Sequence, residues 1–75
     1  MTRMKDPIDI SRDFHVSFLA ALDSAQKGDR IIYHVGPHCG GSHRRDAAGA
    51  AKAGLCLLFC KRAGEGQFAY LAVKR

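Results

Sequence analysis

The chain has 75 residues, which is enough for one domain and too few for a second. Apolar residues make up 47% of it, so it holds enough hydrophobic side chains for a core and differs from a disordered tail. Its formal net charge is +5, from 12 Lys and Arg against seven Asp and Glu. Length and composition together exclude a large enzyme, a repeat array and a collagen or coiled-coil rod.

The positive charge is concentrated after residue 29. Residues 1–29 carry four basic and five acidic side chains, whereas residues 30–75 carry eight basic and two acidic ones. Such a basic region favours a polyanionic partner, most often nucleic acid, although the same charges also suit a solvated surface. No segment reaches the roughly 20 apolar residues that cross a bilayer, so we expect no membrane contact. The three cysteines, an odd number, are a poor disulfide framework and indicate a reducing cytoplasm.

The N-terminal third predicts one helix. Residues 6–9 offer a helix start, because an aspartate precedes a proline, and proline suits the first helical position. Phe14 and Phe18 open an apolar stripe at helical spacing that continues along the segment. Gly28 is a typical left-handed stop. These signals predict a helix over about 11–27.

The middle of the chain predicts a strand, a loop and a second helix. Residues 30–35 are rich in β-branched and aromatic side chains, which indicates a short strand. The glycines and proline of 36–41 break regular structure, and Ser42 is a good N-cap. The alanine-rich residues 43–53 favour a helix with a thin, small-residue face.

The last part predicts a β-hairpin. Residues 55–60 form an apolar run typical of a buried strand, and residues 67–73 form another. The glycine-containing segment 63–66 between them is short enough for a hairpin turn.

The order helix, strand, helix, strand, strand resembles the winged helix, a variant of the helix-turn-helix, over residues 11–75. The resemblance also rests on the basic helix 43–53 directly before the hairpin, and on Lys61 and Arg62 near the hairpin tip. It implies an α+β fold with a three-stranded antiparallel sheet whose third strand is central. The winged helix has two helices between its first two strands, whereas residues 36–42 have room for one helical turn at most. The segment 28–34, the alanine-rich helix and the hairpin also resemble small phage or prophage proteins.

This resemblance implies contacts with duplex DNA. The helix 43–53 would enter the major groove, and the wing at 61–66 would touch phosphate or the minor groove. Arg44 and Arg45 are suited to guanine and Lys52 to phosphate, whereas the same side chains also suit a solvated helix face. The candidate DNA-contacting residues are Ser42, His43, Arg44, Arg45, Gly49, Lys52, Lys61 and Arg62.

Four potential zinc ligands lie within ten residues: His34, His38, Cys39 and His43. Their spacing matches no familiar zinc-finger pattern, so we expect no metal and no other cofactor. A lone Cys39 beside His38 is a weak signal for a nucleophile, and we expect no enzyme. Cys56 and Cys60 are expected to be small buried apolar residues.

Two functions therefore stay open. One is a small DNA-binding domain, and the other is a protein–protein docking or phage-assembly module, which could be a homo-oligomer, with no nucleic-acid role. Residues 1–10 are expected to be a partly flexible N-terminal segment and residues 11–75 the domain. The predicted core consists of Phe14, Phe18, Leu19, Leu22, Ile31, Tyr33, Ala47, Ala51, Leu55, Leu57, Phe59, Leu71 and Val73.

Overall fold

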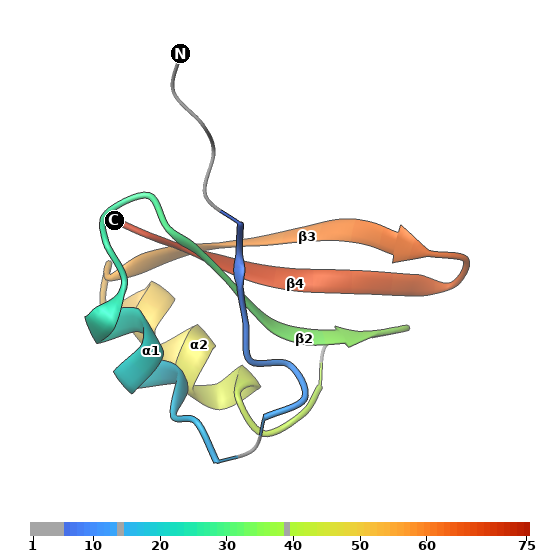
Figure 1. Ribbon diagram of the computed structural model, residues 1–75, viewed down its shortest axis with the longest axis horizontal. Coiled ribbons are helices and arrows are strands. Elements are labelled where there is room, and N and C mark those ends of the chain that lie inside the picture. Colours follow the sequence, from blue (N-terminus) through green and yellow to red (C-terminus); the bar gives the residue numbers. More distant parts are fainter. Residues whose placement is uncertain (1–5, 14, 39) are drawn as a thin grey trace.

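The computed structural model describes residues 6–13, 15–38 and 40–75. Within these residues the strands and helices follow one another as β1 (Ile8–Asp9), α1 (Phe18–Ser24), β2 (Arg30–Gly36), α2 (Arg44–Lys52), β3 (Cys56–Gly64) and β4 (Gln67–Lys74). The strands form one sheet, and both helices pack on the same face of it (Figure 1). No helix in the described part of the chain is long and apolar enough to cross a membrane.

The sheet has four strands in the order β1-β2-β4-β3. The predicted α+β class is confirmed, but the prediction of a three-stranded antiparallel sheet is wrong. Ile8–Asp9, where a helix start was expected, pairs in parallel with β2 and adds a fourth strand. The backbone N–H of Ile10 continues this pairing by donating to the carbonyl of Ile32 at 3.0 Å. The last predicted strand does lie between the other two predicted ones, because β4 pairs antiparallel with both β2 and β3.

Helix α1 is much shorter than the predicted helix over 11–27. It begins at Phe18, after an N-cap at Ser17 whose Oγ accepts a hydrogen bond from the backbone N–H of Ala20 at 3.3 Å. Before Ser17, aspartate side chains accept hydrogen bonds from backbone N–H groups two residues further on. These local turns compete with helix formation, which explains why the apolar stripe alone overestimates the helix.

The core lies between the two helices and the sheet. The side chains of Phe18 and Ile31 are fully buried, and the ring of Phe18 meets that of Tyr33 edge-on with 5.7 Å between centroids. Ala47 and Ala50 of α2 are buried against this cluster, and their small size lets the helix lie close to the sheet. The predicted core residues found buried are Phe18, Leu22, Ile31, Tyr33, Ala47 and Leu71.

Part of the predicted core is exposed. Leu57 and Phe59 are 48% and 53% exposed, because alternate residues of a strand face opposite sides and the described helices cover only the other side. Leu19 and Leu55 are also exposed and line a shallow depression between α1 and the start of β3. Of the remaining predictions, Ala51 and Val73 are partly buried, and Phe14 lies outside the described residues.

Candidate nucleic-acid interface

The outward face of α2 carries most of the predicted DNA contacts. Ala47 and Ala50 turn toward the core, so residues at the complementary helical positions face solvent. Five exposed residues share this face, and we refer to them as the α2 basic face: Arg44, Arg45, Ala48, Gly49 and Lys52. Three cations therefore lie along one helix face with only small residues between them.

Arg44 and Arg45 occupy the first turn of α2. The N-terminal end of a helix carries a partial positive charge, which makes cations there unfavourable and anions favourable. The acid in this turn, Asp46, is partly buried, whereas both arginines are exposed. Together with Gly41 and Ala48 the two arginines line a shallow open depression. The partial charge of the helix end and the two exposed arginines together make the electrostatic potential at the start of α2 positive.

The loop that leads into α2 is organised around the ring of His34. Its Nε2 lies 3.0 Å from the carbonyl oxygen of His38 and must carry the proton, because a carbonyl only accepts hydrogen bonds. The ring also lies against Tyr70, with 5.8 Å between centroids. A Cβ at Gly36 would lie 3.0 Å from this ring, and one at Gly41 would lie 2.9 Å from it. The glycines that signal a loop in the sequence therefore make room for an imidazole.

His43 fixes the start of α2 and is not part of its exposed surface. Its side chain is 6% exposed, and its Nε2 donates to the carbonyl oxygen of Asp13 at 3.1 Å. It also occupies the N-cap position without a side-chain capping bond, so the prediction that Ser42 caps this helix is wrong. His43 thus ties α2 to the segment before α1, whereas Ser42 remains exposed beside it.

Lys61 and Arg62 lie apart from the α2 basic face. Strand β3 continues to Gly64, past the predicted end at residue 60, so both residues belong to the strand. Both are exposed, and as neighbours in a strand they point to opposite faces of the sheet. The hairpin extends well beyond the two helices (Figure 1), so the structure does not gather these two cations with those of α2.

The histidines and cysteines do not form a metal site in the described residues. No group of three or more His, Cys, Asp or Glu side chains is placed there to hold a metal ion, and Cys39 lies outside them. The prediction of buried cysteines is confirmed for Cys56 and wrong for Cys60, which is exposed. Burial raises the pKa of the Cys56 thiol.

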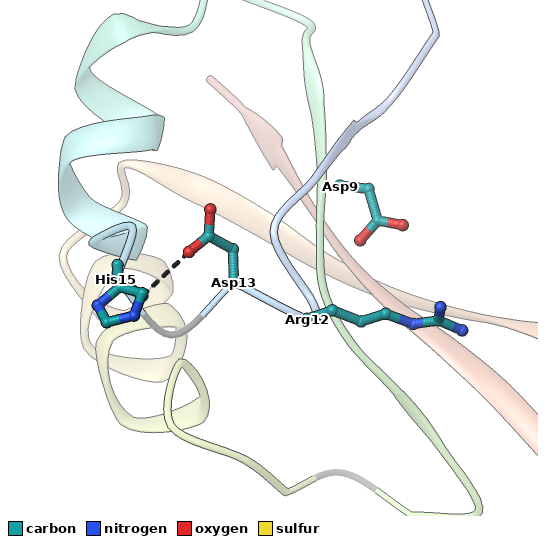
Figure 2. Close-up of a pocket in the computed structure, with 4 residues that line it drawn as sticks. All are labelled: Asp9, Arg12, Asp13 and His15. Atoms are coloured by element: carbon teal, nitrogen blue, oxygen red, sulfur yellow. Dashed lines mark hydrogen bonds between the residues drawn. The ribbon is translucent and has the colours of Figure 1, made fainter.

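A polar pocket that the sequence analysis did not identify lies before α1. Asp9, Arg12, Asp13 and His15 line it, as Figure 2 shows. The Asp13 carboxylate accepts a hydrogen bond from the backbone N–H of His15 at 3.0 Å, and the side chain of Arg12 points away from both (Figure 2).

The remaining carboxylate of this pocket also belongs to a local turn. Asp9 accepts hydrogen bonds from the hydroxyl and the backbone N–H of Ser11, at 2.6 and 2.9 Å. These bonds, with a smaller contribution from the nearby Arg12 charge, lower the pKa of Asp9. The spacing of aspartate and serine two residues apart was the available sequence signal, and it is typical of a turn. In Figure 2 the carboxylates of Asp9 and Asp13 and the guanidinium of Arg12 lie apart from one another.

The second exposed surface is the helix-free face of the sheet. Alternation along the strands places Leu57 and Phe59 of β3 there, beside Leu71 and Val73 of β4. A shallow, largely apolar groove on this side is lined by Arg30, Phe59, Cys60, Lys61, Leu71 and Val73.

No protein-family model matches the chain, and comparison with curated proteins and with solved structures finds no match. The function therefore has to be inferred from these two surfaces.

Proposed function

We propose that this protein binds duplex DNA through the α2 basic face. The observation that carries the proposal is the alignment of Arg44, Arg45 and Lys52 on one exposed helix face, with Ala48 and Gly49 between them. Small residues at these positions allow the helix backbone to approach a groove closely, and the cations then reach phosphates on either side. No catalytic step is part of this role, and the cytoplasm is its compartment.

The chemistry of the face favours phosphate contacts over base reading. Lysine and arginine neutralise phosphates, and each neutralised phosphate releases counterions, so affinity falls as salt rises. Three such contacts give a slope of log K against log salt of about −3. Because the face contains no Asn or Gln, base discrimination depends on the two arginines, which can pair with guanine in the major groove.

The hairpin can add a second contact, on a different part of the duplex. Lys61 and Arg62 point to opposite faces of the sheet, so only one of them can face a duplex that lies along α2. If that residue also contacts a phosphate, the slope of log K against log salt becomes steeper, at about −4. The slope therefore measures whether the hairpin acts as a wing.

The test is titration of a fluorescently labelled duplex at several salt concentrations, read by anisotropy. In the double variant Arg44→Ala/Arg45→Ala, we expect weaker binding and a salt slope smaller by about two. The matched control is Arg12→Ala/Lys27→Ala, which removes the same charge from exposed positions outside α2 and should keep the wild-type slope. Equal effects of the two double variants would show that only net charge matters and would refute a role for α2.

A docking module is the second candidate, and the helix-free sheet face favours it. Large side chains such as Phe59 are about half exposed there, and contiguous apolar surface on a small protein commonly marks an interaction site. Absence of binding to the duplex at low salt, together with concentration-dependent association, would favour docking over DNA binding.

A further inference from the structure

The outer edge of β3 is long, apolar and open. The sheet order places β3 at the end of the sheet, with β4 as its strand neighbour among the described residues. The strand runs from Cys56 to Gly64 along the longest dimension of the molecule (Figure 1). Its first half reads Cys-Leu-Leu-Phe-Cys, with no charge before Lys61. An edge of this length and composition is a template for pairing with another strand.

The hydrogen bonds that β3 makes toward β4 show which backbone groups of β3 point to its outer edge. Arg75 donates its N–H to the carbonyl of Leu55 at 3.1 Å, so Leu55 bonds toward the β4 side. In an antiparallel ladder the direction alternates along the strand. Residues 57, 59 and 61 therefore also bond toward β4, and residues 56, 58 and 60 direct their N–H and C=O groups outward.

Bonds on the far side of β4 give the same assignment. Lys74 lies opposite Cys56, and its backbone N–H and C=O bond to Asp29 and Gly28 at 3.0 and 2.8 Å. The backbone groups of Lys74 therefore point away from β3. Because Lys74 and Cys56 lie opposite each other in an antiparallel pair, the backbone groups of Cys56 point away from β4.

The edge is self-complementary about Leu58. If two copies meet antiparallel with Leu58 opposite Leu58, Cys56 of each copy lies opposite Cys60 of the other. These are the residues with outward backbone groups, and the arrangement makes about six hydrogen bonds between the copies. Leu57 of one copy then packs beside Phe59 of the other on the helix-free face, where both are now about half exposed.

The charges of the strand are compatible with this pairing. Lys61 lies three residues from the two-fold centre, so the two copies of Lys61 are six positions apart along the strands. At about 3.4 Å per residue this is about 20 Å, well beyond a Debye length of about 8 Å at physiological salt. The repulsion between like charges is therefore screened, and the contacting segment is neutral.

We propose that the protein forms a two-fold symmetric dimer by antiparallel pairing of the β3 edges around Leu58, which joins two four-stranded sheets into one. The partner is a second copy of this chain. In a two-fold pairing the same β3 edge forms both sides of the contact, so the outward backbone groups and apolar side chains of each copy meet those of the other. The inference does not depend on DNA binding, since the α2 basic face is a separate surface.

The test is sedimentation equilibrium from micromolar to millimolar protein, combined with amide hydrogen exchange. We expect the mass to rise with concentration toward twice the 8.2 kDa of the chain. The amides of Leu58 and Cys60 should become protected as the mass rises, whereas those of Leu57 and Phe59, already bonded to β4, should change little. Faster exchange at Leu58 and Cys60 than at Leu57 and Phe59 within a formed dimer would refute edge pairing.

Leu58→Pro is the sharpest variant. Proline removes an N–H that faces the free edge, so the ladder with β4 keeps its hydrogen bonds. We expect the dissociation constant to rise by about tenfold or more, because the hydrogen bonds at the two-fold centre are lost. Leu58→Lys provides a second route to the same result, since it places two like charges face to face.

Val35→Lys is the matched control, because Val35 is 42% exposed against 39% for Leu58 and lies away from β3. It should leave the dissociation constant unchanged. Loss of the dimer in this control would move the interface to the sheet face and overturn the proposal. A wild-type chain that stays monomeric at millimolar concentration would overturn it as well. Backbone chemical shifts of each variant establish that the fold is retained.

Discussion

Replacing Gly41 by alanine tests whether the His34 ring shapes the loop that leads into α2. Gly41 has φ +82°, in the left-handed region, where a Cβ costs about 1 to 2 kcal/mol. The added Cβ would also lie 2.9 Å from Nδ1 of His34, well inside ordinary van der Waals contact. To relieve this contact the ring must shift and weaken its hydrogen bond to the carbonyl of His38, which adds about 1 kcal/mol. The expected loss of unfolding free energy is therefore about 2 to 3 kcal/mol.

Gly28→Ala separates the two contributions. Gly28 has φ +91° and is exposed like Gly41, but a Cβ there meets no atom within 4 Å. It should cost about 1 to 2 kcal/mol, from the backbone alone. The effect of alanine on the unfolded chain is the same at both positions and cancels in the comparison.

The assay is urea denaturation followed by far-UV circular dichroism, since the chain has no tryptophan. A double-mutant cycle completes it. In a His34→Ala background the contact is absent, so Gly41→Ala should cost no more than Gly28→Ala, a coupling of about 1 kcal/mol. Equal losses for the two glycine variants in the wild-type background, or no coupling with His34, would refute the role assigned to the ring.

Two further predictions concern ionisable groups. The folded pKa of Asp9 is lowered from its ordinary value of 3.8, so its contribution to stability is present above that value and is lost as the pH falls through the folded pKa. Ser11→Ala should raise the pKa of Asp9 toward 3.8, because the Ser11 hydroxyl is the largest cause of the shift, and carboxyl NMR titration measures it. For the thiols, a maleimide at mildly alkaline pH should modify exposed Cys60 rapidly and buried Cys56 only on unfolding, as peptide mass mapping would show. Equal rates at the two thiols would contradict the burial of Cys56.

The sequence predicted β2, β3, β4 and the second helix to within a few residues at their ends, and it missed β1, where a helix start was expected. Branched and aromatic side chains mark β2, and alanine marks α2, because these are local preferences. The helix over 11–27 was overestimated, since the turns before Ser17 depend on single hydrogen bonds that an apolar stripe does not reveal. The exposure of Phe59 was also missed. A continuous apolar run is typical of a strand buried on both faces, and nothing in the run shows that both helices pack on one side.

The candidate site was predicted in part. The spacing of Arg44, Arg45 and Lys52 on one helix face follows from the helical period, so their common exposure could be anticipated. The burial of His43 and the position of His34 could not, because each depends on a contact with a distant segment of the chain. The separation of Lys61 from α2 likewise depends on how far the hairpin extends, which the turn residues do not determine.

The two edges of the sheet are unequal. At one end β1 is two residues long, follows a proline and carries the charge of Asp9, all features that discourage another strand from adding. At the other end β3 offers nine residues. An assembly that grows without limit needs an open, apolar edge at both ends of each sheet, and the sheet formed by the described residues has one. Pairing through β3 therefore covers the open edge of both copies, and no β3 edge is left for a third copy. Assembly ends at the dimer, so the apolar strand at the surface does not lead to fibres.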